Sequence, residues 1–178
     1  MACVLTTGRT EPCRDSIGGL KSVFLLDFLE DSFTITGGEA TAVNASISSG
    51  DVYKYELVAD GNNFAQTNAV DPNTNNTTYD QVGTIVLKKQ DLATTNQLDI
   101  VAKGRPVAVY HYRDGSYRIQ GISDGTVVTG DSASGGAKSE FNGYNRTLTS
   151  TETSPAPFMD SSTITAFLAL VSATVINP

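Results

Sequence analysis

Histidine, tryptophan and cysteine are scarce in this chain, and each shortage removes a class of chemistry. The 178 residues include one histidine, His111, two cysteines and no tryptophan. Every catalytic pair or triad that uses histidine would therefore have to use His111. Cys3 and Cys13 match no zinc-ligand spacing and have no second Cys/His pair to complete a site. They are interpreted as reduced thiols in an N-terminal arm, with a disulfide between them as the alternative.

Basic residues and long apolar runs are also scarce. Twelve Lys and Arg stand against 19 Asp and Glu, for a formal net charge of −7. Specific nucleic-acid binding needs clustered cations to neutralise phosphates, so it is not expected, whereas an acidic surface would repel DNA. The most apolar run, Ile164–Val171, is too short to span a bilayer. The N-terminal MACVLTTGR lacks the apolar region of a signal peptide. These features predict synthesis in a cytosol and no membrane partner.

Glycine, threonine, serine and asparagine are frequent, which is typical of a β-rich protein with many turns. The length predicts a single domain over residues 1–178, with an irregular arm at 1–20 and a C-terminal extension at 161–178. Alternation and apolar runs predict the strands Ser22–Phe28, Ser32–Thr36, Asp51–Asp60, Phe64–Val70, Tyr79–Lys89, Glu140–Glu152 and Ser161–Asn177. Ala40–Ser48 is interpreted as a strand or a loop, and Asp124–Gly136 as a flexible loop or a frayed strand pair.

Two Asp-Gly steps predict hairpins. Asp60-Gly61 would join the strand Asp51–Asp60 to its return strand Phe64–Val70. Asp114-Gly115 would be a two-residue turn inside Arg105–Ile122. That turn pairs Tyr112 with Tyr117, Tyr110 with Ile119 and His111 with Arg118. Tyr110, Tyr112, Tyr117 and Ile119 would then share one aromatic and apolar face.

One helix is predicted, at Gln90–Lys103. Its apolar stripe would be Leu92, Gln97, Leu98 and Val101. Asp91 lies in the first turn, and Gly104 can end the helix. The fold class expected is therefore mainly β, with two packed antiparallel sheets in a sandwich or barrel and one short α-helix.

No catalytic, metal or cofactor site is predicted. His111 is interpreted as a structural residue on the polar face of its hairpin. The isolated Asp residues fall in turns, where they serve turn geometry. Asp71–Asn76 is rich in oxygen ligands but lacks the EF-hand spacing for calcium. The sequence therefore predicts a binding or assembly protein rather than an enzyme. A hydrolase that uses two paired carboxylates is the least favoured alternative.

Three segments in the second half of the chain resemble the tail tube proteins of tailed bacteriophages. They are YDQVGTIVLKKQD leading into a helix, the hairpin RPVAVYHYRDGSYRIQGISDG, and GGAKSEFNGYNRTLTSTETSPAPF with a strand after a Gly/Ser lead-in. The resemblance covers about half of the chain, from Tyr79 to Phe158. The N-terminal GRTEPCRDSIGGLKSVF is similar to a segment of uncharacterised virion proteins. The N-terminal arm and residues 161–178 depart from a minimal tube protein.

The resemblance implies a virion structural protein of the phage tail, made in the host bacterial cytoplasm. Six copies would close a ring whose inner sheets merge into one barrel. Rings would stack through the arm and the 51–70 hairpin and contact other phage tail proteins. Double-stranded DNA would pass through this acidic conduit without specific binding. The lumen-facing acids expected are Glu56, Asp80 and Glu140. The contacts expected between copies are Asp60, Gly61, Phe64, Tyr144 and Leu148.

Other virion or binding roles remain open from the sequence. They are a tail terminator or adaptor ring, a capsid decoration protein, and an immunoglobulin-like adhesion domain that binds carbohydrate. The adhesion domain would use the tyrosines that lie at strand spacing, which are more often core residues.

Overall fold

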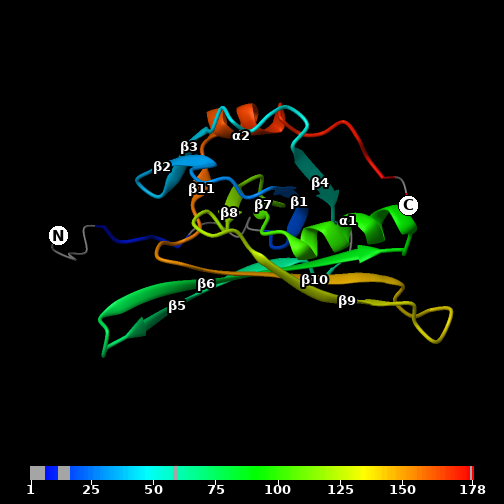
Figure 1. Ribbon diagram of the computed structural model, residues 1–178. Coiled ribbons are helices and arrows are strands. Elements are labelled where there is room, and N and C mark those ends of the chain that lie inside the picture. The colour runs from blue at the N-terminus through cyan, green and yellow to red at the C-terminus, as the bar shows by residue number, and fades with distance from the viewer. Residues whose placement is uncertain (1–6, 12–16, 58–59, 177) are drawn as a thin grey trace.

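Two β-sheets pack face to face, and helix α2 (Ser161–Leu168) covers the outer face of the larger sheet (Figure 1). The structure is a computed structural model that describes residues 7–11, 17–57, 60–176 and 178. The predicted arm at 1–20 lies partly outside the described residues. Cys3 and Cys13 both lie outside them. Residues 7–11 and 17–18 are exposed and form no helix or strand. The mainly β class with two packed sheets, predicted from the sequence, is confirmed.

The larger sheet has seven strands in the order β2-β3-β11-β8-β7-β1-β4. Their bounds are β1 Leu20–Leu26, β2 Phe33–Thr36, β3 Glu39–Val43, β4 Val52–Glu56, β7 Val107–Tyr112, β8 Tyr117–Gln120 and β11 Phe158–Met159. The pairs are antiparallel except β3–β11, which is parallel. β1 lies between β7 and β4 and is buried on both faces, as its apolar sequence predicts.

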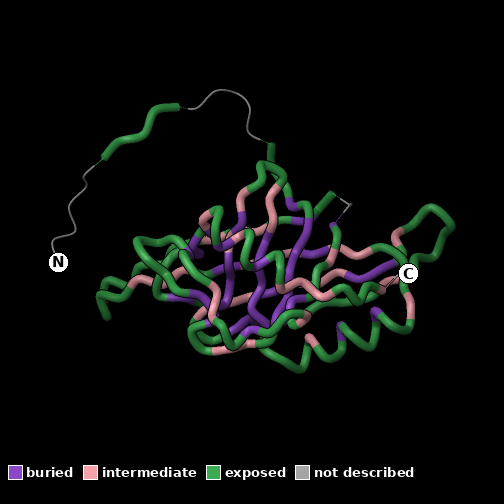
Figure 2. Tube along the Cα trace, turned by 90° about the horizontal axis from the view of Figure 1, so that it is seen from above, coloured by how far each residue is buried: buried purple, intermediate pink, exposed green. Residues whose placement is uncertain are grey.

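The smaller sheet has four antiparallel strands in the order β5-β6-β10-β9. Their bounds are β5 Asn63–Asp71, β6 Asn76–Lys88, β9 Val127–Ala133 and β10 Gly143–Glu152. β5 and β6 form a long hairpin whose far end, from Ala69 to Thr78, extends beyond the last residue that β10 pairs with. Residues 69–76 of this hairpin are exposed, whereas buried residues concentrate in the central strands (Figure 2).

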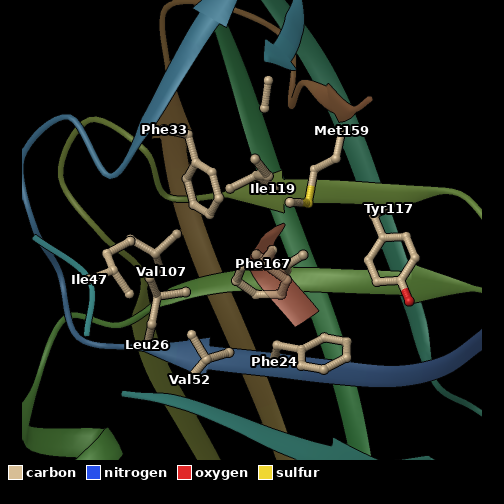
Figure 3. Close-up of a cluster of buried hydrophobic side chains, with 12 residues drawn as sticks. Phe24, Leu26, Phe33, Ile47, Val52, Val107, Tyr117, Ile119, Met159 and Phe167 are labelled. Carbon is tan, nitrogen blue, oxygen red and sulfur yellow. The ribbon is translucent and has the colours of Figure 1, made fainter. Parts of the chain in front are cut away.

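One apolar core lies between the larger sheet and α2. Phe167 of α2 is fully buried there, and its ring meets Phe24 edge-on with centroids 5.4 Å apart. Phe33 packs on the same ring, and Met159 and Ile119 complete the centre of the cluster (Figure 3). Burial of these large side chains is what holds α2 on the sheet.

A second core lies between the two sheets and contains a buried polar network. Tyr110 is fully buried and its hydroxyl donates to Gln120 Oε1 at 2.6 Å. Gln120 Nε2 then donates to the carbonyl oxygens of Gln81 (2.8 Å) and Leu148 (3.1 Å) in the smaller sheet. Gly83 lies against the Tyr110 ring, where a Cβ would overlap the hydroxyl. Side chains of one sheet therefore bond the backbone of the other.

The hairpin predicted over 51–70 is wrong. β4 pairs with β1 in the larger sheet, and β5 pairs with β6 in the smaller one. Gly61 has the positive φ (+95°) of a turn residue, so the Asp60-Gly61 turn signal is present. This turn carries the chain from the larger sheet to the smaller one, because the apolar side chains of β4 and of β5 pack in different layers.

The 105–122 hairpin forms, but its predicted register is wrong by one residue. Tyr112 N–H donates to Ser116 O (2.9 Å), Gly115 N–H donates to Tyr112 O (3.1 Å), and Gly115 has φ +90°. This is the three-residue turn with a glycine bulge, in place of a two-residue turn. His111 now pairs with Tyr117.

This register divides the expected aromatic face between the two cores. Tyr117 and Ile119 belong to the cluster under α2, whereas Tyr110 and Tyr112 belong to the cluster between the sheets. The His111 ring stacks on Tyr117 with centroids 4.3 Å apart.

The helices match the sequence analysis in part. α1 (Leu92–Lys103) begins at Asp91, which accepts the N–H of Thr94 at 2.8 Å, and ends at Gly104. Its buried residues are Thr94 and Leu98, whereas Leu92 is exposed, so the expected stripe is only partly correct.

The last apolar segment was predicted as a strand but contains α2. Asp160 accepts the N–H of Thr163 and so begins the helix. Capping and the burial of Phe167 outweigh the β preference of Val and Thr.

Candidate functional site

The smaller sheet has one face that no other described element covers. Its inner face packs on the larger sheet, and α1 lies on that same side, with Leu98 close to Ile85 and Leu148 (Figure 1). The outer face is formed by residues that alternate with these buried ones. They are Asn63, Ala65, Thr67, Asp80, Val82, Thr84, Val86, Lys88, Val127, Thr129, Asp131, Asn145, Thr147, Thr149 and Thr151. We call this set the outer face.

Both edges of the smaller sheet are open. β5 pairs only with β6 and β9 pairs only with β10 among the described strands. Neither β5 (NFAQTNAVD) nor β9 (VVTGDSA) contains the lysine or proline that commonly blocks an exposed edge. Unblocked edge strands of nine and seven residues are suited to pairing with another chain.

The three acids predicted to share a lumen lie in separate places. Asp80 is on the outer face and accepts a hydrogen bond from the Thr151 hydroxyl at 2.7 Å. Glu56 is on β4 of the other sheet and pairs with Lys54 at 2.7 Å, which lowers its pKa. Glu140 was expected in a strand but lies in the loop before β10. There it accepts the N–H groups of Gly136 and Ala137, which lower its pKa.

The residues predicted to contact other copies divide into exposed and buried positions. Asp60 and Gly61 are exposed at the crossing between the sheets. Phe64 is half-buried on the inner side, 4.9 Å from the Tyr110 ring. Tyr144 and Leu148 are 2% and 1% exposed. They lie in the core of this chain and leave no surface for a second copy, because they alternate onto the inner face of β10.

Sequence reasoning leaves 124–136 open between a flexible loop and a frayed strand pair, so it does not place the acid Asp131 on a sheet face. The glycines and serines favour a loop, although Val127, Thr129 and Asp131 alternate with Val128 and Gly130. That short alternation was the available signal. β9 pairs with β10 because Gly130 allows the two backbones to approach closely. A Cβ at that position would overlap the Asn145 carbonyl.

Titratable groups do not gather into a reactive cluster within the described ranges. No group of three or more His, Cys, Asp or Glu side chains there could hold a metal ion. His111 Nδ1 lies 3.3 Å from the Ser22 hydroxyl. Burial and then the charges of Lys21 and Lys54 lower its pKa. Within the described residues, the most distinctive feature is therefore the uncovered face and the two open edges of the smaller sheet.

No protein-family model, curated protein or solved structure matches this chain. Neither helix in the described part of the chain is long and apolar enough to cross a membrane.

Proposed function

We propose that this protein is a virion structural subunit, a tail tube protein or close tail-ring relative, that assembles through the edges of its smaller sheet. The observation that carries the proposal is a four-stranded antiparallel sheet with an uncovered face and two open, unblocked edges. Pairing of β9 with β5 of the next copy removes both edges at once. A contact between two different surfaces closes into a ring when its rotation permits.

Strand direction supports a continuous barrel. Each neighbouring pair in β5-β6-β10-β9 is antiparallel, so β9 runs opposite to β5. When copies are related by rotation about the ring axis, β9 of one copy and β5 of the next are therefore also antiparallel. Four strands per copy keep the alternation around the ring, and the outer faces would form one side of the barrel wall.

The charge of the outer face supports a conduit for DNA. Asp80 and Asp131 lie on it against a single Lys88, and the remaining positions are mostly Thr, Val and Asn. The whole chain carries a formal charge of −7, which is multiplied in a ring. Such a wall repels a polyanion and offers it no cationic binding site.

The first experiment is negative-stain electron microscopy over a concentration series, with the copies per particle counted by mass photometry. We expect hollow rings or tubes. Trimers that do not stack would favour a capsid decoration protein. A chain that stays single at every concentration would favour a carbohydrate-binding domain.

An edge variant tests where the copies meet. Val127→Lys with Thr129→Lys places two charges on the exposed edge strand β9, and we expect it to abolish assembly. The matched control is Thr149→Lys with Thr147→Lys, which changes the direct ladder partners one strand inward on the same face. Equal assembly of the two variants, or equal loss with both folded, would reject pairing through β9.

A further inference from the structure

β4 is an open edge of the larger sheet. Leu57 N–H donates to Lys21 O at 3.0 Å, on the side of β1. Because backbone groups alternate in direction along an antiparallel pair, the N–H and C=O groups of Lys54 and Glu56 point to the opposite, open side. Val52 O faces that side too, and it accepts Ser172 N–H at 2.8 Å.

The C-terminal segment begins to pair with this edge and then leaves it. Val171 forms a parallel bridge with Val52, and Gly50 N–H donates to Leu170 O at 2.8 Å. The chain then bends at Ala173, where Thr174 N–H donates to the Ser172 hydroxyl at 3.2 Å. An open groove of about 940 Å³ is lined by this segment, by β4 with Tyr53 and Tyr55, and also by the end of β6 and by α1.

The bridge determines the register that further pairing would take. In a parallel ladder continued from Val52 and Val171, Lys54 lies opposite Ala173 and Glu56 opposite Val175. Thr174 N–H would donate to Lys54 O, and Glu56 N–H to Thr174 O. The segment Val171–Ile176 has the length to cover β4 to its end at Glu56.

We infer that Val171–Ile176 closes onto β4 as an eighth, parallel strand and caps that edge of the larger sheet. The unpaired backbone of Lys54 and Glu56 supplies the partners. In this register Ala173 and Val175 share a face with Lys54 and Glu56. Ser172 and Thr174 lie beside Tyr53 (46% exposed) on the other face and would cover part of its side chain. The segment is tethered to β4 at Val171, so its pairing is intramolecular and does not depend on concentration.

Ser172 sets the balance between the two arrangements. In the open arrangement its hydroxyl holds Thr174 N–H in a local turn. In the closed arrangement the same N–H donates to Lys54 O. Serine side chains compete with strand ladders for backbone donors in this way. Closure would protect β4 and would leave β5 and β9 as the open edges of the smaller sheet. It is a property of a single copy and does not depend on the proposed ring.

The test is amide hydrogen exchange at Lys54 and Glu56, followed by NMR on the ¹⁵N-labelled full chain. We expect both amides to exchange about tenfold faster in Thr174→Pro, because proline lacks the required N–H and its ring collides with the facing strand. Thr174→Ala keeps the N–H and is expected to match the parent chain. Ser172→Ala is expected to slow exchange. The Val109 amide, in the core, reports that each variant is folded.

Two results would overturn the inference. One is equal exchange at Lys54 and Glu56 in all four chains. The other is protection that disappears on dilution, because a second copy would then supply the strand.

Discussion

Replacing Gln120 with leucine is expected to lower the free energy of unfolding by about 2–4 kcal/mol. Gln120 is fully buried and makes three hydrogen bonds, one from the Tyr110 hydroxyl and two to carbonyl oxygens of the smaller sheet. Leucine has a similar size but leaves the Tyr110 hydroxyl buried without an acceptor. A buried donor without a partner costs about 1–3 kcal/mol, and two carbonyls that each lose a donor add about 1 kcal/mol.

A double-mutant cycle separates this polar effect from packing. Tyr110→Phe alone is expected to cost about 1–3 kcal/mol, because Gln120 Oε1 then lacks a donor. Gln120→Leu with Tyr110→Phe removes both members of the bond and is expected to cost about 1–2 kcal/mol, well below the sum of the single changes. Urea denaturation followed by circular dichroism measures the three values, with an unchanged m-value showing that the folded state is comparable. Additivity within about 0.5 kcal/mol would refute the reasoning.

Five further variants test the cores, the cap of α1 and the pH dependence of stability. Leu148→Asp is expected to prevent folding, because it buries an unpaired charge, and a folded variant detected by circular dichroism would contradict this. Gly83→Ala should cost about 1–3 kcal/mol through overlap with the Tyr110 ring, so unchanged urea stability would reject that contact. Asp91→Ala should cost about 1 kcal/mol, and Asp91→Asn, which keeps the cap, much less. Burial and two nearby lysines lower the pKa of His111, so stability present above about pH 6.5 is lost as pH falls through its folded pKa. His111→Gln should remove the loss of stability just below pH 6.5. The loss near pH 4, which depends on carboxylates, should remain.

Local patterns predicted many of the elements. The apolar run of β1, the alternation of β6 and β10, and the end of α1 were all identified from residues within one segment. Gly104 ends α1 as expected, whereas Asp91, expected inside the first turn, is the residue that caps it. These features depend on neighbours within a few positions, and short-range physical chemistry is sufficient for them.

The acidic residues of the candidate site were predicted less completely than the strands and helix. Asp80 was placed in the correct strand, and it lies on the outer face of the smaller sheet. Glu56 was also placed in a strand, but that strand belongs to the other sheet. Asp131 was missed, since a strand with Gly130 and flanking serines has almost no apolar signal of its own. Membership of a face depends on which strands become neighbours, and a single segment does not carry that information.

The sequence by itself determined the β-rich class, the acidic charge, the scarcity of catalytic residue types and the positions of the principal turns. Each of these follows from composition or from residues close along the chain. Only the tertiary structure decided the partners of β4 and β5, the one-residue register of the 107–120 hairpin and the helical state of Ser161–Leu168. In each case the local signal was compatible with two arrangements. Burial against distant residues, such as Phe167 on Phe24 and Tyr110 against Gly83, selected between them.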